Sequence, residues 1–208
     1  MQKPLLIYLF VLVSTQIFAE EIKITTIDFS NCGLDTQSIQ LAKLIVESSG
    51  QQRKVLLCDK TLAQAAHNKA KDLAEFDVIS HFVDHVSPNE HLKNEGILLP
   101  YDYEFIGNQV ESILGGKETY QESFDSFMSS SPHKAHLLGE SEFLVSQDHM
   151  GVGYYYKEKN KDYVHFWVVY ITSFRNKDDK MKIFTTGKPT FYFVPREKRK
   201  RKKKVNRN

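Results

Sequence analysis

Two histidines, His81 and His133, are the residues of this chain best suited to share one chemical site. Each comes after a segment with helical apolar spacing, His81 directly following Ser80 and His133 directly following Pro132. Because short connections reverse the chain and bring helix ends together, we expect the two imidazoles to lie near each other. An imidazole can ligate a divalent metal or exchange a proton near neutral pH. The spacing therefore predicts one histidine-based site.

The remaining histidines fit structural roles better. We expect them in loops or packed on helices and strands: His67, His85, His91, His136, His149 and His165. His85 and His136 would share a helical face with His81 and His133 only if a helical turn formed at each place. The serine run 129–131 lacks the Gly-x-Ser-x-Gly elbow of many serine hydrolases, so no serine nucleophile is expected beside His133.

Three segments have the apolar periodicity of helices, namely 36–49, 61–76 and 118–128. Thr36 or Ser38 can cap the first helix, and Asp59 or Thr61 can cap the second. Pro132 marks the end of the third segment.

Strand signals come later in the chain. Runs rich in aromatic residues and valine at 150–156 and 163–174 predict two antiparallel strands joined by the charged turn 157–162. A short third strand is predicted over 106–113. Segment 182–194 is a candidate edge strand, although its proline weakens that prediction.

Five landmarks in a fixed order resemble the bacterial form of the CAP superfamily, also called SCP-like (cysteine-rich secretory proteins, antigen 5, pathogenesis-related 1). They run through residues 39–174: Leu56 to Ala66, Ser80-His81, Gly107 to Val110, Phe127 to Leu138, and Gly151 to Gly153 followed by Trp167. The resemblance implies an α+β fold, a three-layer α-β-α sandwich with a central antiparallel sheet and an open cleft. It also implies that His81 and His133 lie in the cleft, where family members often hold a divalent metal such as zinc.

The chain departs from this family at two acidic positions. The first carries Asn108, and the second falls among Ser130 and Ser131. An amide or a hydroxyl cannot act as a carboxylate base at neutral pH. If 106–113 is a strand, Glu111 points to the opposite face from Asn108, and only a three-residue bulge would bring it there. The expected cleft therefore contains histidines without acids, unless a loop supplies one.

The N-terminus indicates export. Residues 1–19 contain Lys3, an apolar run too short to span a membrane, and Ala19 as a candidate cleavage site. We divide the chain into a signal peptide (1–19), a lead-in (20–35), one CAP-like domain with a C-terminal extension (36–195) and a basic tail (196–208). The mature protein would be secreted or periplasmic, with no membrane-spanning segment after signal removal.

The two cysteines, Cys32 and Cys58, have two possible states. In an oxidising compartment a disulfide would close a loop of about 25 residues and stabilise the fold by about 3 kcal/mol. The alternative is two reduced, partly buried thiols, because the sequence does not report the distance between them.

Charge is distributed unevenly along the chain. Nine basic residues and one acid give the segment from Arg196 to Arg207 a charge of +8, so the net charge of +2 leaves −6 for the rest. Such a tail can bind an anionic lipid or polymer, or simply remain solvated. No base-reading motif or interleaved aromatic residue accompanies it, so specific nucleic-acid binding is not expected.

Three functions follow as alternatives. The missing acids favour an exported binding or scaffold protein whose cleft takes a small amphipathic ligand or an envelope polymer. The second is a metal-dependent hydrolase of peptide or cell-wall material, with His81 and His133 as metal ligands and an acid from elsewhere. The third is an envelope-attachment module that acts through the basic tail.

Overall fold

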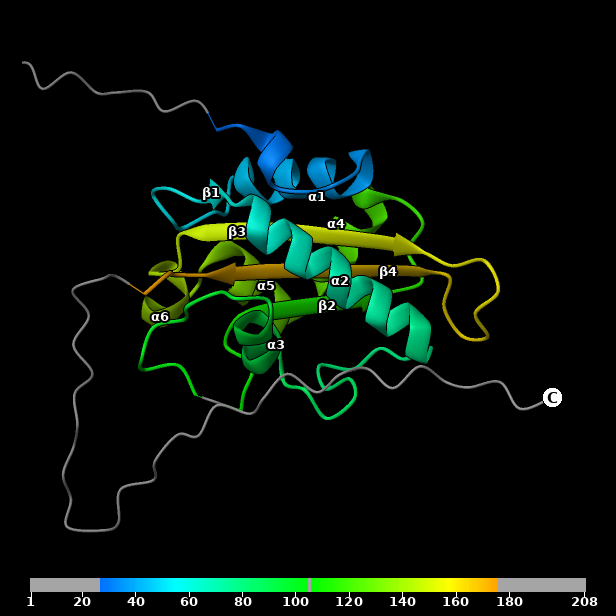
Figure 1. Ribbon diagram of the computed structural model, residues 1–208. Coiled ribbons are helices and arrows are strands. Elements are labelled where there is room, and N and C mark those ends of the chain that lie inside the picture. Colours follow the sequence, from blue (N-terminus) through cyan, green and yellow to red (C-terminus); the bar gives the residue numbers. More distant parts are fainter. Residues whose placement is uncertain (1–26, 105, 176–208) are drawn as a thin grey trace, which may run out of the picture.

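A sheet with helices on both faces forms the body of the protein (Figure 1). The computed structural model describes residues 27–104 and 106–175. The predicted signal peptide 1–19, the candidate edge strand 182–194 and the basic tail 196–208 lie outside the described residues. Within the described ranges, no helix is long and apolar enough to cross a membrane.

Four strands make up the sheet in the order β1-β3-β4-β2. Their bounds are Leu57–Cys58 for β1, Glu111–Gly115 for β2, His149–Tyr156 for β3 and His165–Thr172 for β4. Strands β3, β4 and β2 pair antiparallel, whereas the short β1 pairs parallel with β3. The two long predicted strands are confirmed, and β1 is an addition that no apolar pattern indicated.

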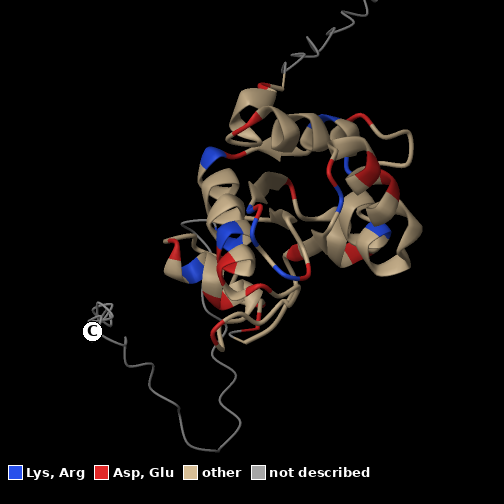
Figure 2. Ribbon diagram, turned by 90° about the vertical axis from the view of Figure 1, so that its right-hand side faces the viewer, with Lys and Arg blue, Asp and Glu red and all other residues tan. Residues whose placement is uncertain are grey.

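Helices precede and interrupt these strands. They are the 3-10 helix η1 (Phe29–Asn31), α1 (Thr36–Val46), α2 (Lys60–Phe76), α3 (Pro88–Asn94), α4 (Tyr120–Ser129), α5 (Ser131–Leu138) and α6 (Glu142–Val145). The three predicted helices correspond to α1, α2 and α4. Charged residues lie on the helices and loops, and among the described strands only β2 carries one, Glu111 (Figure 2).

Strand β4 separates two hydrophobic cores because its side chains alternate between the faces of the sheet. Phe166, Val168 and Tyr170 pack in one core with α2 and α3. Trp167, Val169 and Ile171 pack in the other core with buried residues of α1, α4 and α5: Leu41, Ala42, Ile45, Phe127 and Leu137. A sheet covered on both faces in this way is the predicted three-layer α-β-α sandwich.

Glycines in β3 let α2 lie directly on the sheet. A Cβ atom at Gly151 would collide with the backbone at Leu62 and Ala63, and one at Gly153 would collide with the backbone at Ala66. The absence of side chains there allows α2 to approach more closely than packed side chains would permit. The helix that precedes His81 is therefore fixed against the centre of the sheet.

A disulfide joins Cys32 to Cys58, which is one of the two states that the sequence leaves open. Cys32 follows η1 and is fully buried in the core beneath α1. Its carbonyl also accepts a hydrogen bond from the backbone N–H of Val152 in β3. The lead-in before α1 is thus attached to the sheet by a covalent bond and a hydrogen bond.

Several predicted boundaries were wrong, each for a local reason. Asp35, rather than Thr36 or Ser38, is the N-cap of α1, and its carboxylate and the Ser38 side chain bond reciprocally to each other's backbone N–H. Asp59 does cap α2. Pro132 lies in the first turn of a new helix, α5, where its missing N–H costs nothing, so His133 lies within a helix and not behind one.

The close contact between α2 and β3 predicts that Gly153→Ala destabilises the protein by about 3 kcal/mol, because backbone must move to admit the methyl group. Urea unfolding at constant m-value measures this loss. Gly115→Ala is the matched control, since its methyl group would meet the movable Ile79 and Tyr163 side chains and should cost no more than about 1 kcal/mol. Equal losses in the two variants would contradict the packing argument.

Candidate functional site

A cavity of about 440 Å³ lies between β2 and the helices α5 and α6. His81 and His133 both line it, as the sequence predicts, and His136 is a third imidazole in the wall. Apolar side chains make up another part of the lining: Val110, Pro132, Phe143 and Leu144. This size and mixture of polar and apolar groups suits a small organic molecule.

Of the residues at the two positions where the family resemblance implies acids, only one lies in the wall of the cavity. Asn108 lines the cavity, but Ser130 and Ser131 do not. Ser130 is the N-cap residue of α5, with no capping bond from its side chain, and Ser131 is exposed on the first turn. The structure thus brings together His81, His133 and Asn108 and leaves the serines outside.

The cavity contains a carboxylate, Glu111, which corrects the prediction of a histidine-only cleft. Residues 106–110 are not a strand. Instead, the Asn108 side-chain oxygen accepts hydrogen bonds from the backbone N–H of Glu111 at 2.9 Å and of Val110 at 3.3 Å. Asn108 thus lies in a turn that leads into β2 at Glu111, so strand alternation does not relate the two side chains.

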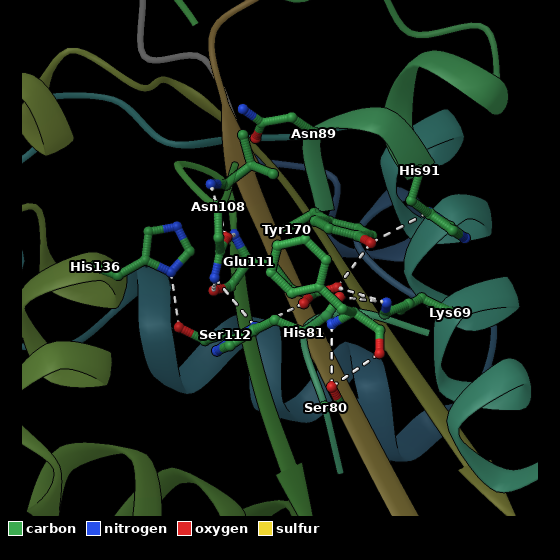
Figure 3. A network of polar contacts seen from close by, with 12 residues as sticks. Lys69, Ser80, His81, Asn89, His91, Asn108, Glu111, Ser112, His136 and Tyr170 are labelled. Atoms are coloured by element: carbon green, nitrogen blue, oxygen red, sulfur yellow. Dashed lines mark hydrogen bonds and ion pairs between the residues drawn. The ribbon is translucent and has the colours of Figure 1, made fainter. Parts of the chain in front are cut away.

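Glu111 is a buried charge with three partners (Figure 3). One carboxylate oxygen lies 2.8 Å from Nδ1 of His81. The other accepts a hydrogen bond of 2.8 Å from the Tyr170 hydroxyl and lies 3.9 Å from the Lys69 ammonium. The side chains of Glu111 and Lys69 are 0% and 1% exposed. These partners replace the water that the buried carboxylate has lost.

The bonding pattern makes Nδ1 of His81 a hydrogen-bond donor. Its Nδ1 lies within reach of the Glu111 carboxylate and also 3.1 Å from the Asn108 amide nitrogen. The Asn108 oxygen is already an acceptor for backbone N–H groups, so its nitrogen is the atom nearest His81. That nitrogen donates to the Glu111 carbonyl at 3.1 Å. Because the Glu111 carboxylate can only accept, Nδ1 of His81 carries a proton and donates a hydrogen bond to it. The other ring nitrogen, Nε2, takes no part in these bonds, and the side chain is 38% exposed.

Tyr170 extends the network to a further histidine, His91. Burial and the charge of Glu111 raise the pKa of Tyr170, which keeps the phenol protonated and donating to Glu111. Nδ1 of His91 lies 3.2 Å from the same hydroxyl oxygen and must be its donor. Burial, and then the positive charge of Lys69, lower the pKa of His91 to about 4. The chain from His91 through Tyr170 and Glu111 to His81 is thus one continuous network.

His136 and Ser112 form a buried pair that is unsuited to nucleophilic catalysis. The Ser112 hydroxyl lies 2.8 Å from Nδ1 of His136. Burial, and then the positive charge of Arg53, lower the pKa of His136 to about 3, against an opposing contribution from the Ile171 backbone. So weak a base cannot activate a serine hydroxyl. No sequence pattern indicated that His136, rather than its neighbours, would be the histidine buried on α5.

Arg53 fixes the helix that carries His133 and His136. Its guanidinium donates to the carbonyls of His136 at 2.8 Å, Leu137 at 2.9 Å and Gln147 at 2.6 Å. Two of these carbonyls belong to the last turn of α5, where a positive charge is favourable. Burial, followed by the charge of His81, lowers the pKa of His133, whose ring lies edge-on to Phe127 at 5.3 Å.

Among the residues that the structure describes, no three His, Cys, Asp or Glu side chains are arranged to hold a metal ion. His81 and His133 could supply two ligands, and Glu111 is already engaged by its three partners. A metal at this place would need the rest of its coordination shell from water or from a bound molecule.

The buried histidines predict a loss of stability in mild acid. Between pH 6.5 and their lowered folded-state pKa values, His91 and His136 bind protons only in the unfolded chain, so acid favours unfolding. Above pH 6.5 the two histidines contribute fully to the free energy of unfolding. Below pH 6.5 this free energy decreases by about 1.4 kcal/mol per pH unit for each histidine. Urea unfolding between pH 6.5 and 5 should show this slope, and His136→Gln should reduce it by one histidine's share. If His136→Gln left the slope unchanged, His136 would not be one of the histidines that lose their proton on folding.

Comparisons with known proteins give structural neighbours only. The sequence matches no known family and no curated protein. An outer surface protein from Borrelia burgdorferi is similar in structure, with 19% identity and a TM-score of 0.47 over 65% of this chain and 88% of that one. An extracellular protein containing an SCP domain from Bacillus anthracis shows 18% identity and a TM-score of 0.46 over 64% of this chain and 39% of that one. Similarity at this level carries no argument about function, so the resemblance to the SCP-like family stays a prediction.

Proposed function

We propose that this chain is an exported binding protein whose cavity takes a small amphipathic molecule through Nε2 of His81. The observation that carries the proposal is the bond between Nδ1 of His81 and the buried Glu111, which orients a cavity-lining ring and leaves its Nε2 outside the network. The predicted signal peptide and the disulfide between Cys32 and Cys58 support export, because disulfides persist mainly in oxidising compartments.

The lining of the cavity indicates the chemistry of the ligand. A hydroxyl or amide N–H can donate to Nε2 of His81, and Glu111 behind the ring strengthens this acceptor. An apolar group can pack against Val110, Phe143 and Leu144. The lack of an adequate base beside Ser112, since the His136 pKa is about 3, favours binding over covalent catalysis.

A metal-dependent hydrolase is the second candidate. Its support is that a metal-ligating histidine commonly donates its other N–H to a carboxylate, as His81 does to Glu111. The attachment function of the basic tail stays a prediction, because residues 196–208 lie outside the described part of the chain.

A fragment screen by ligand-observed NMR tests the binding function. We expect compounds with an alcohol or amide beside a small apolar group to bind, and His81→Ala to weaken them at least tenfold, which is a loss of about 1.4 kcal/mol or more. His149→Ala is the matched control, since His149 also pairs with a carboxylate, Asp148 at 2.7 Å, but does not line the cavity. The proposal fails if both variants bind the compounds equally well.

Zinc titration by calorimetry separates the two candidates. The binding function predicts no stoichiometric zinc uptake at micromolar concentrations, because the described side chains provide fewer than three suitable ligands in one place. Stoichiometric uptake that is lost in both His81→Ala and His133→Ala would instead support the hydrolase. Circular dichroism of each variant establishes that it is folded before the comparison is made.

A further inference from the structure

A cavity of about 490 Å³, which we call the β1 groove, lies at the β1 edge of the sheet, opposite the β2 edge that carries the candidate site. Most of its lining is apolar: Ile27, Val46, Val55, Leu56 and Leu57. The side chain of Val55 is 53% exposed, and those of Val46 and Leu57 are half-buried. Burial of this apolar surface by a further element would stabilise the fold.

The backbone of β1 is also unpaired on this side. The N–H groups of Leu57 and Asp59 bond to the carbonyls on either side of His149, at 2.8 and 2.9 Å. Because neighbouring residues of a strand direct their N–H groups to opposite sides, those of Leu56 and Cys58 face away from β3. No described group accepts a hydrogen bond from either of them. An edge of this kind can pair with a further strand.

The described chain begins in the wall of the β1 groove, at Ile27. Residues 20–26 come directly before Ile27 and follow the predicted signal peptide. Within them Ile22 and Ile24 alternate with polar residues, which is the period of a half-buried strand. Seven extended residues span about 23 Å. The segment can therefore run along the β1 edge without a linker.

The charges of the groove suit this segment. Arg53 and Lys54 are the charged side chains in its described lining, and both are cationic. The Arg53 guanidinium already donates to backbone carbonyls, whereas Lys54 is exposed and has no ion pair with a described residue. In an extended segment Glu20 lies on the same face as Ile22 and Ile24. Its carboxylate can thus pair with Lys54 while the isoleucines face the apolar lining.

We propose that residues 20–26 bind in the β1 groove of their own chain as a further strand, with the two isoleucines buried against Val46 and Val55. The strand would cover an edge that is otherwise open to pairing with other chains. Ile27 holds one end of the segment at the groove, so its effective concentration there is far above that of a separate partner. The inference concerns the β1 edge and does not depend on the function proposed for the cavity beside β2.

Methyl NMR of the chain expressed from Glu20 tests this placement. In a sample labelled at isoleucine and valine methyl groups, we expect nuclear Overhauser contacts from Ile22 or Ile24 to Val46 or Val55. Amide hydrogen exchange at residues 22–26 should be at least tenfold slower than in a synthetic peptide of the same sequence. The absence of both signals would overturn the proposal.

Two double variants separate the faces of the segment. Ile22→Ser/Ile24→Ser removes the apolar face, so the exchange protection factors at 22–26 should fall at least tenfold. Lys23→Ser/Thr25→Ser is the matched control on the opposite face and should keep those factors within twofold. Circular dichroism establishes that both variants are folded. Equal loss of protection in the two variants would contradict burial of the isoleucine face.

Dilution distinguishes the chain's own segment from that of a second copy. Labelled chain is mixed with a tenfold excess of unlabelled chain, and the methyl contacts are measured again. Contacts within one chain keep their intensity per labelled molecule, which is the expected result. Contacts that fall with dilution would show that the groove takes the segment of a second copy, and would overturn the assignment to the same chain.

Discussion

The buried carboxylate of Glu111 is the constraint on which the rest of the site depends. Removing an ion from water costs several kcal/mol, and only well-placed partners offset this cost. Those partners come from three separate places, with Lys69 on α2, Tyr170 on β4 and His81 in the loop after α2. The charge is stable only when α2, the sheet and this loop are correctly assembled, so the network couples the geometry of the cavity to the packing of two layers.

Much of the fold could be predicted from the sequence because long elements repeat their apolar pattern several times. The helix α2, of 17 residues, and the strands β3 and β4 were found in this way, within a few residues of their ends. The helices α3, α5 and α6 and the strand β1 have only two to eight residues each, too few for a periodic signal. They are stabilised by caps and by tertiary contacts such as those of Arg53 with the last turn of α5.

The candidate site was predicted only in part, and the error at Glu111 has a physical reason. Motif order predicted that His81 and His133 share one site, and both line the cavity beside β2. The role of Glu111 was missed because alternation was counted from Asn108, although Asn108 forms a turn before the strand begins. One signal did exist. Lys69 interrupts the apolar stripe of α2, lying four residues after Ala65 and four before Leu73, and a lysine on a buried face requires an anion nearby.

The same carboxylate determines the hydrogen-bonding state of two histidines on different cavities. His81 donates a hydrogen bond to Glu111 directly. His91 donates one to the Tyr170 hydroxyl, which in turn donates one to Glu111. In both rings Nδ1 is therefore the donor, and Nε2 takes no part in the network. One ring lines the cavity beside β2 and the other lines a cavity between α2 and α3. The network that holds one buried carboxylate thus also orients an imidazole ring in the wall of each of two cavities.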